Sequence, residues 1–137
     1  MARYIESSAL IAARFENDAV AQQSIRGEGI RFTSALTFAE FARRVVRGTV
    51  AGHITPARAR AALLWLRRFQ RGCDVVEIDD GVLAKVRRPF PLEPVRTLDA
   101  IHLATMELRD LEPSLIAVVT RDRRIADNAR AMGYLVE

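Results

Sequence analysis

Cysteine is almost absent from this 137-residue chain, which contains a single one, Cys73. A lone cysteine excludes an internal disulfide framework, and such a chain is expected in a reducing compartment. No second cysteine and no nearby histidine accompanies it, so a thiolate metal site is excluded as well. Stability must come from an ordinary hydrophobic core, for which this length is sufficient.

Long hydrophobic runs are also missing. The longest is the six-residue stretch 61–66, whereas a membrane-spanning helix needs about 20 apolar residues. No signal peptide is recognisable, because Arg3 leads directly into a segment with the pattern of a strand. Half of the residues are hydrophobic, which is typical of a globular chain. We therefore expect a cytoplasmic protein with no membrane association.

Lysine is scarce too: Lys85 is the only one, and the other basic residues are arginines, which leave a net charge of +4. Arginine presents a planar fork that pairs bidentately with phosphate, so this balance suits a polyanionic partner such as a nucleic acid. A bias toward arginine codons in a GC-rich genome explains the balance equally well. The charge alone leaves nucleic-acid binding open.

Short apolar segments alternate with amphipathic ones along the whole chain. Capping residues mark the boundaries, such as Thr55 before Pro56 at the start of one helix and Gly72 after its end. Strands are predicted at 3–6, 30–33, 75–78, 115–120 and 134–136, and helices at 9–14, 17–26, 35–47, 56–71, 79–87, 98–109 and 122–132. We predict an α/β fold with one domain, residues 1–137, built on a central parallel sheet of about five strands flanked by helices on both faces.

Four carboxylates stand at or beyond the ends of predicted strands: Glu6, Glu40, Asp99 and Asp122. Ligand sites of open α/β sheets form outside the carboxyl ends of the strands, so we expect these acids to converge at one edge. An acid in apolar surroundings is costly unless it is paired, hydrogen-bonded or bound to a cation. The set predicts a divalent-metal site, and its oxygen ligands favour Mg²⁺ or Mn²⁺ over zinc.

Each acid also has an ordinary structural explanation. Asp99 and Asp122 suit the first turn or the cap of a helix, where the helix dipole favours negative charge. Glu40 suits an exposed ion pair with Arg44, one turn further on. Glu6 is harder to explain in this way, because a short apolar strand has little reason to end on an acid. Taken singly the alternatives stay open, and the conjunction of four acids favours the metal site.

Four sequence blocks carry these acids: Y-I-E-S-S-A-L, L-T-F-A-E-F-A-R-R, T-L-D-A-I-H-L-A-T and V-V-T-R-D-R-R-I-A. They resemble the signature blocks of PIN-domain nucleases, and the size and block order resemble the VapC toxins of bacterial toxin–antitoxin pairs. The resemblance spans essentially the whole chain. It implies a Mg²⁺- or Mn²⁺-dependent endoribonuclease that is neutralised by a small VapB-like antitoxin. It also implies that Glu6, Asp99 and Asp122 face the metal directly or through water, while Glu40 orients a metal-bound water or completes the shell of metal ligands.

The first block departs from the family's pattern, in which the first acid is usually Asp. Glu6 is one methylene longer, so its oxygen approaches the metal along a different path, and Mg²⁺ demands near-octahedral geometry. We expect a site that is retuned rather than broken. The rival hypothesis is a non-catalytic PIN-like module that binds RNA or protein through a degenerate metal site. A receiver-like signalling domain is disfavoured, because it needs a late lysine and the only one is Lys85.

Several neighbouring residues have two interpretations each. Ser8 is either a helix cap or a hydroxyl that supports the metal ligands. His102 invites a general-acid role, but a histidine between apolar neighbours is predicted to be a packed or hydrogen-bonded helix residue. Arg121, Arg123 and Arg124 either guide an RNA phosphate or form a solvated charge run.

The predicted helix 56–71 contains the apolar run 61–66, which covers more than one helix face. Part of this run is expected to be exposed in a monomer, which indicates a partner interface. The candidates are the antitoxin and a second copy of the chain, giving a homodimer or a toxin–antitoxin hetero-oligomer. Core packing against the preceding helix is the alternative.

Overall fold

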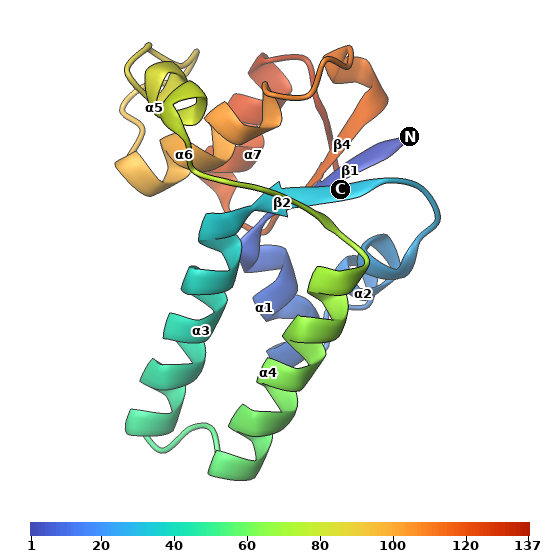
Figure 1. Cartoon of the computed structure of the whole chain (residues 1–137), viewed down its shortest axis with the longest axis vertical. Helices are drawn as coiled ribbons and strands as arrows, with labels where there is room; N and C mark the ends of the chain where they lie inside the picture. The colour runs from blue at the N-terminus through green and yellow to red at the C-terminus, as the bar shows by residue number, and fades with distance from the viewer.

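The structure, a computed structural model, describes all residues from Met1 to Glu137 and contains a five-stranded sheet and seven α-helices (Figure 1). The strands are β1 (Ala2–Ile5), β2 (Arg31–Ser34), β3 (Asp74–Val76), β4 (Ile116–Val119) and β5 (Leu135–Val136). The helices are α1 (Ser7–Phe15), α2 (Ala19–Arg26), α3 (Ala35–Val50), α4 (Pro56–Arg71), α5 (Asp80–Val86), α6 (Thr97–Met106) and α7 (Arg123–Ala131). None of the helices combines the length and the hydrophobicity that a membrane crossing requires.

All five strands run parallel, in the order β3-β2-β1-β4-β5. Tyr4 of the central strand β1 is in register with Phe32 of β2 and with Val118 of β4. Strand β4 is buried along its whole length, as its apolar sequence predicts. The predicted α/β class and five-stranded parallel sheet are confirmed. This strand order also places the carboxyl ends of β2, β1 and β4 side by side.

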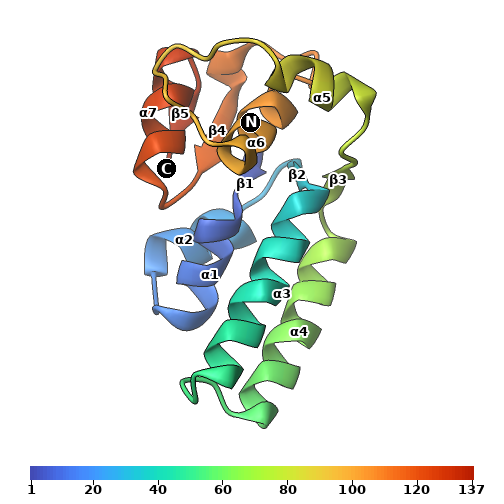
Figure 2. The same cartoon turned by 90° about the vertical axis from the view of Figure 1, so that its left-hand side faces the viewer.

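The sheet separates two hydrophobic cores, one on each face (Figures 1 and 2). Successive side chains of a strand point to opposite faces, so Tyr4 of β1 enters one core and Ile5 enters the other. Helices α5, α6 and α7 close the first core, whose members include Val82, Leu103 and Ile125. Helices α1 to α4 close the second, whose members include Leu10, Ala21, Phe41 and Leu66. The prediction of helices on both faces is confirmed.

Helices α3 and α4 pack side by side and extend away from the sheet as a hairpin (Figure 2). Phe41 of α3 stacks on Trp65 of α4, with ring centroids 5.9 Å apart. Part of the apolar run of α4 is exposed, as expected, since Leu64 is 52% exposed whereas Ala62 and Leu66 are buried. The run therefore contributes both to the core and to the surface.

Most predicted helix boundaries lie within two residues of the observed ones, but two helix ends are wrong by three residues. Helix α3 continues past Gly48 to Val50, and Gly48 is buried in its last turn, where a Cβ would clash with the side chain of Ile54. Glycine is present there because of a close contact and not as a stop signal. Helix α6 ends at Met106 rather than at Arg109, since the chain turns before β4.

Candidate metal centre

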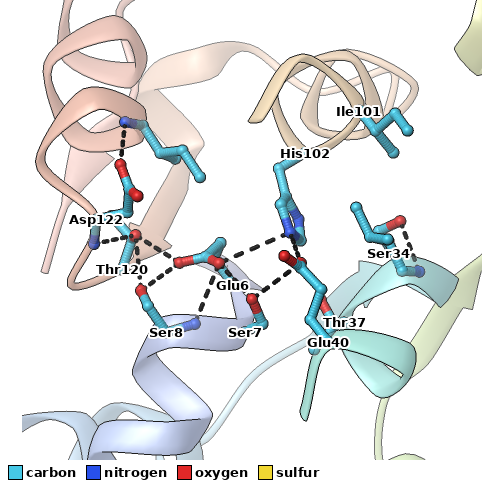
Figure 3. Close-up of polar contacts among 12 residues, drawn as sticks. Glu6, Ser7, Ser8, Ser34, Thr37, Glu40, Ile101, His102, Thr120 and Asp122 are labelled. Carbon is cyan, nitrogen blue, oxygen red and sulfur yellow. Dashed lines mark hydrogen bonds and ion pairs between the residues drawn. The ribbon is translucent and has the colours of Figure 1, made fainter. Parts of the chain in front are cut away.

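The carboxyl edge of the sheet gathers the beginnings of four helices. Helices α1, α3 and α7 follow the adjacent strands β1, β2 and β4, and the first turn of α6 lies beside them. The four predicted acids lie on these helix beginnings: Glu6, Glu40, Asp99 and Asp122. Figure 3 shows three of them with the polar groups that hold them. Strand-end placement thus brings Glu6, Glu40 and Asp122 together. For Asp99 the strand-end prediction is wrong, because α6 follows α5 and a loop, and Asp99 reaches the cleft through the packing of α6.

Glu6 is 3% exposed and occupies the N-cap position of α1. Its Oε1 accepts hydrogen bonds from Ser7 Oγ (2.6 Å) and from the Ser8 N–H (3.1 Å), and its Oε2 accepts from Ser8 Oγ and from Thr120 Oγ1 (2.7 Å). Four donors compensate for the burial of this carboxylate. Ser8 therefore supports Glu6 and does not cap the helix itself, which decides between its two interpretations.

Glu40 projects from the second turn of α3 toward His102 of α6 (Figure 3). Nε2 of His102 lies 2.6 Å from Glu40 Oε1 and 3.6 Å from Glu6 Oε1, and Nδ1 lies 2.6 Å from Tyr4 Oη. Ser7 Oγ lies 3.0 Å from Glu40 Oε1. Glu6, Glu40 and His102 each offer a ligand atom, and these atoms lie within 4.8 Å of one another. The prediction that His102 is a hydrogen-bonded helix residue is confirmed, and its bond is to one of the four acids.

Asp99 and Asp122 lie on the open side of the cluster, where they line a cleft of about 530 Å³ together with Glu40. Asp122 caps α7 by accepting a hydrogen bond from the Ile125 N–H (3.0 Å), so its structural explanation holds while its carboxylate also faces the cleft. Asp99 lies in the first turn of α6 but does not cap it, because the N-cap residue is Arg96. Burial raises the pKa of the Asp99 carboxyl, and the negative charge of Asp122 raises it further.

No arginine or lysine forms an ion pair with any of the four acids; the only basic partner in the cluster is His102. The alternative pairing of Glu40 with Arg44 is therefore wrong. Four carboxylates without a balancing guanidinium or ammonium group match the oxygen ligands that hard divalent cations prefer. The residues present thus fit a divalent cation, in agreement with the chemistry predicted for this edge.

Arginines line the rim of the cleft rather than its centre. Arg96, Arg123 and Arg124 contribute to its wall. Arg121 points elsewhere, since its Nε donates to Asp18 Oδ2 over 2.6 Å in an ion pair between the β4–α7 loop and the N-cap residue of α2. Of the three arginines considered from the sequence, Arg123 and Arg124 are therefore the ones placed to meet a ligand in the cleft.

Sequence reasoning missed Tyr4 and Thr120. Tyr4 bonds to His102, and the Thr120 hydroxyl donates to Glu6 while accepting from the Asp122 N–H (3.0 Å). A weak signal existed for both. Each is a polar residue two positions before an acid of the set; Tyr4 lies within β1, and Thr120 directly follows β4.

A second cavity, of about 620 Å³, lies between α1, α2 and α4. Its wall contains four arginines and two aromatic residues but no carboxylate: Arg14, Arg26, Arg31, Arg68, Trp65 and Phe69. The Nε atoms of Arg14 and Arg31 are buried and bond to no protein acceptor. This arginine-lined cavity is the electrostatic opposite of the acidic cleft.

Residues 3–131 match the PIN domain family. The chain is 34% identical to ribonuclease VapC35 of Mycobacterium tuberculosis, over 97% of this chain and 93% of that protein. It is also 34% identical to ribonuclease VapC46 of the same organism, over 97% of this chain and 94% of that one. The chain belongs to the VapC group of the PIN-domain family. The resemblance of the four sequence blocks is thereby confirmed.

Solved structures show the same fold. PAE2754 from Pyrobaculum aerophilum aligns with a TM-score of 0.66 at 21% identity, covering 99% of this chain and 83% of that one. A chain of a toxin–antitoxin complex from Klebsiella pneumoniae aligns with a TM-score of 0.55 at 20% identity, covering 88% of this chain and 86% of that one. At these identities the likeness concerns the fold, and the acids of this family member must be interpreted from its own geometry.

Proposed function

We propose that this protein is the toxin of a toxin–antitoxin pair and an endoribonuclease that depends on Mg²⁺, with Mn²⁺ as the alternative ion. The observation that carries the proposal is the convergence of three carboxylates on one cleft, with the buried Glu6 next to Glu40, and no arginine or lysine paired to any of the four. Their charge calls for a hard divalent cation. The relatives VapC35 and VapC46 are ribonucleases by name, which supports the reaction class.

The four acids have unequal parts in this proposal. Asp99 and Asp122 face the open cleft and would hold the ion. Glu40 would orient a water or complete the shell, because its Oε1 is bonded to His102 while no protein donor bonds its Oε2. Glu6, which already accepts four hydrogen bonds, would contribute its charge and reach the ion through water. A divalent cation held there supplies the Lewis acid that activates water and screens the charge that builds on the phosphate.

The rim arginines would bind the RNA backbone. Arg96, Arg123 and Arg124 border the cleft and are exposed, so a phosphate brought to the acids would lie within their reach. Such contacts position a nucleic acid without reading its bases. They also offset the repulsion that four carboxylates exert on a polyanion.

Cleavage of total bacterial RNA with Mg²⁺ or Mn²⁺, by the wild type and by Asp99→Asn, tests the function. We expect the wild type to cleave RNA and to lose this activity in chelator. The rate of the variant should be at least about 100-fold lower, because one charge of the site is gone. Asp127→Asn is the matched control, since Asp127 lies on α7 and pairs with Arg130 outside the acidic cluster. A wild type that cleaves no RNA with either ion would contradict the proposal.

The binding state of Glu6 favours a second candidate, the non-catalytic module. All four of its hydrogen bonds come from the protein, so this carboxylate is the least available of the four to an ion. The same assay separates the candidates when RNA binding is measured beside it. Tight RNA binding without cleavage under either metal would favour the non-catalytic module.

The proposal includes an antitoxin that docks in the arginine-lined cavity through an acidic segment. Four guanidinium groups share that cavity with no carboxylate, and two of their Nε atoms are buried without a protein acceptor. A partner that brings carboxylates would relieve both costs. The Klebsiella pneumoniae neighbour, a toxin–antitoxin complex, supports this kind of partner. Action in the cytoplasm and self-association through the exposed part of α4 complete the proposal.

A further inference from the structure

His102 is more deeply buried than Glu6 and Glu40, the two acids beside it, with 1% of its surface exposed. It comes from α6, whereas its two closest partners come from β1 and α3, so it joins three elements (Figure 3). Nδ1 lies 2.6 Å from Tyr4 Oη, and Nε2 lies 2.6 Å from Glu40 Oε1. Both ring nitrogens are thus engaged, one on each side of the imidazole.

The surroundings of Tyr4 assign the direction of these bonds. A phenol has an ordinary pKa of about 10 and keeps its proton at neutral pH, and His102 Nδ1 is the one hydrogen-bond partner of the Tyr4 hydroxyl. The phenol proton is therefore available to His102 Nδ1, and a neutral imidazole that accepts at Nδ1 carries its own proton on Nε2. That proton points to Glu40.

Glu40 has no other dedicated donor. Ser7 Oγ lies 3.0 Å from Glu40 Oε1, but this hydroxyl oxygen of Ser7 also lies 2.6 Å from Glu6 Oε1. A hydroxyl carries one proton, and the shorter contact takes it to Glu6. The His102 Nε2–H is then the one bond that holds Glu40, whose side chain is 27% exposed at the cleft.

We propose that His102 is a positioning residue for Glu40, and that Tyr4 sets the tautomer that makes this possible. This inference rests on the proposed metal-dependent function. The relay Tyr4–His102–Glu40 holds Oε1 in place and leaves Oε2 free of protein donors for a cation or its water. Donors of this kind orient metal ligands and strengthen their binding.

Three substitutions test the relay. His102→Leu removes the Nε2–H donor and puts an apolar side chain of similar size in its place. His102→Gln restores an N–H near the position of Nε2, and Tyr4→Phe removes the phenol that fixes the tautomer. His53→Gln is the matched control, because His53 is the only other histidine and is exposed in the turn between α3 and α4. Mn²⁺ affinity is measured by calorimetry without RNA, and kcat and KM are measured with RNA.

We expect His102→Leu to weaken Mn²⁺ binding by about tenfold or more, the effect typical of losing such a donor. His102→Gln should recover most of this loss, Tyr4→Phe should show a smaller loss, and His53→Gln should show none. The RNA effect should appear in kcat rather than in KM. Wild-type Mn²⁺ affinity in His102→Leu, or equal losses in His102→Leu and His102→Gln, would overturn the proposal.

A readout on the metal-free protein separates failure of the relay from failure of the function. Long-range ¹⁵N–¹H NMR at about pH 8.5, well above the ordinary imidazole pKa of about 6.5, reports the neutral tautomer. We expect His102 protonated on Nε2 in the wild type and a mixture of tautomers in Tyr4→Phe. A wild-type Nδ1–H tautomer would overturn the relay whether or not the protein cleaves RNA. The Nε2–H tautomer in a wild type that binds no Mn²⁺ would instead overturn the proposed function and the role of the relay in it.

Discussion

The acidic cleft and the arginine-lined cavity are both clusters of like charge, but the protein treats them differently. At the acidic edge, Glu6 accepts four hydrogen bonds and Glu40 is held by His102, so the inner carboxylates have fixed positions. In the cavity, Arg14 makes no hydrogen bond through its buried Nε, and Arg68 is exposed. The inner carboxylates of the cleft are thus held by protein donors, whereas in the cavity only Arg31 is held, by the carbonyls of Ile25 and Gly27.

This difference corresponds to the size of the ligand that each cluster suits. A small ion needs ligands held in advance at fixed distances, because it brings no structure of its own. A polypeptide brings its own carboxylates and can order flexible guanidinium groups as it binds. This difference is the reason why we propose an ion in the cleft and a protein partner in the cavity. Three predictions test this assignment.

The largest effect is expected from reversing a charge in the cavity. Arg14→Glu should weaken binding of the antitoxin, taken as the product of the reading frame beside this gene, by about 100-fold, since a paired charge is replaced by a repelling one. RNA cleavage should be unchanged. Calorimetry and the RNA assay measure the two effects.

Arg60→Glu is the control for this reversal, because Arg60 is exposed on the same protein and lies on α4 outside the cavity. An equal loss of antitoxin affinity in the two variants would mean that the net charge of the protein, and not the cavity, determines binding. A loss of RNA cleavage with intact antitoxin binding would assign the cavity to RNA and break the comparison.

A smaller effect is expected from loosening the acidic edge. Thr120→Val removes a donor to Glu6 and leaves the Asp122 N–H without its acceptor, which should lower the free energy of unfolding by about 1–3 kcal/mol. Thr105→Val is the control, because this buried hydroxyl donates only to the Ile101 carbonyl one turn earlier. Urea denaturation measures the free energy of unfolding of both variants. Equal losses would mean that the Thr120 hydroxyl has no special part in holding the acids.

The smallest effect concerns the stability of Asp99→Asn. The folded state raises the pKa of this carboxyl, so its contribution to stability is present in acid and is lost as the pH rises through the folded pKa. In chelator the variant should match the wild type near pH 4 and exceed it at neutral pH, by less than about 1 kcal/mol because water screens the half-exposed group.

Added Mn²⁺ should reverse this order at neutral pH, since an ion that binds only the folded wild type stabilises it. Thermal unfolding with chelator and with Mn²⁺ measures both halves of the prediction. A wild type that stays less stable than Asp99→Asn in excess Mn²⁺ would mean that the acidic repulsion has no cation to relieve it.

Strand ends were sufficient to place Glu6 and Asp122 at one edge, since both follow inner strands of the sheet. They do not place Asp99, which follows α5 and a loop. They were also not sufficient to rank the acids. The buried Glu6 accepts a hydrogen bond from Thr120, which lies 114 positions away in the sequence. His102, which holds Glu40, lies 62 positions from it. Partners at such separations depend on tertiary packing, which local periodicity does not encode.

The arginine-lined cavity could not be predicted from the sequence, because it too depends on tertiary packing. Its arginines and aromatic residues come from three helices and from β2, and only Trp65, Arg68 and Phe69 of α4 form a set at helical spacing. The abundance of arginine was evident, but which side chains share a cavity depends on how α1, α2 and α4 pack. Gly48 is a parallel case, because its neighbour Ile54 across the turn, rather than its own backbone preference, explains it.

Titration of Mn²⁺ into metal-free protein, with the free ion followed by its paramagnetic resonance, tests most directly whether the carboxyl edge is a cation site. The account predicts saturable binding to the wild type, at least about tenfold weaker binding to Asp99→Asn, and unchanged binding to Asp127→Asn. No binding to the wild type, or equal affinity in the wild type and Asp99→Asn, would contradict it.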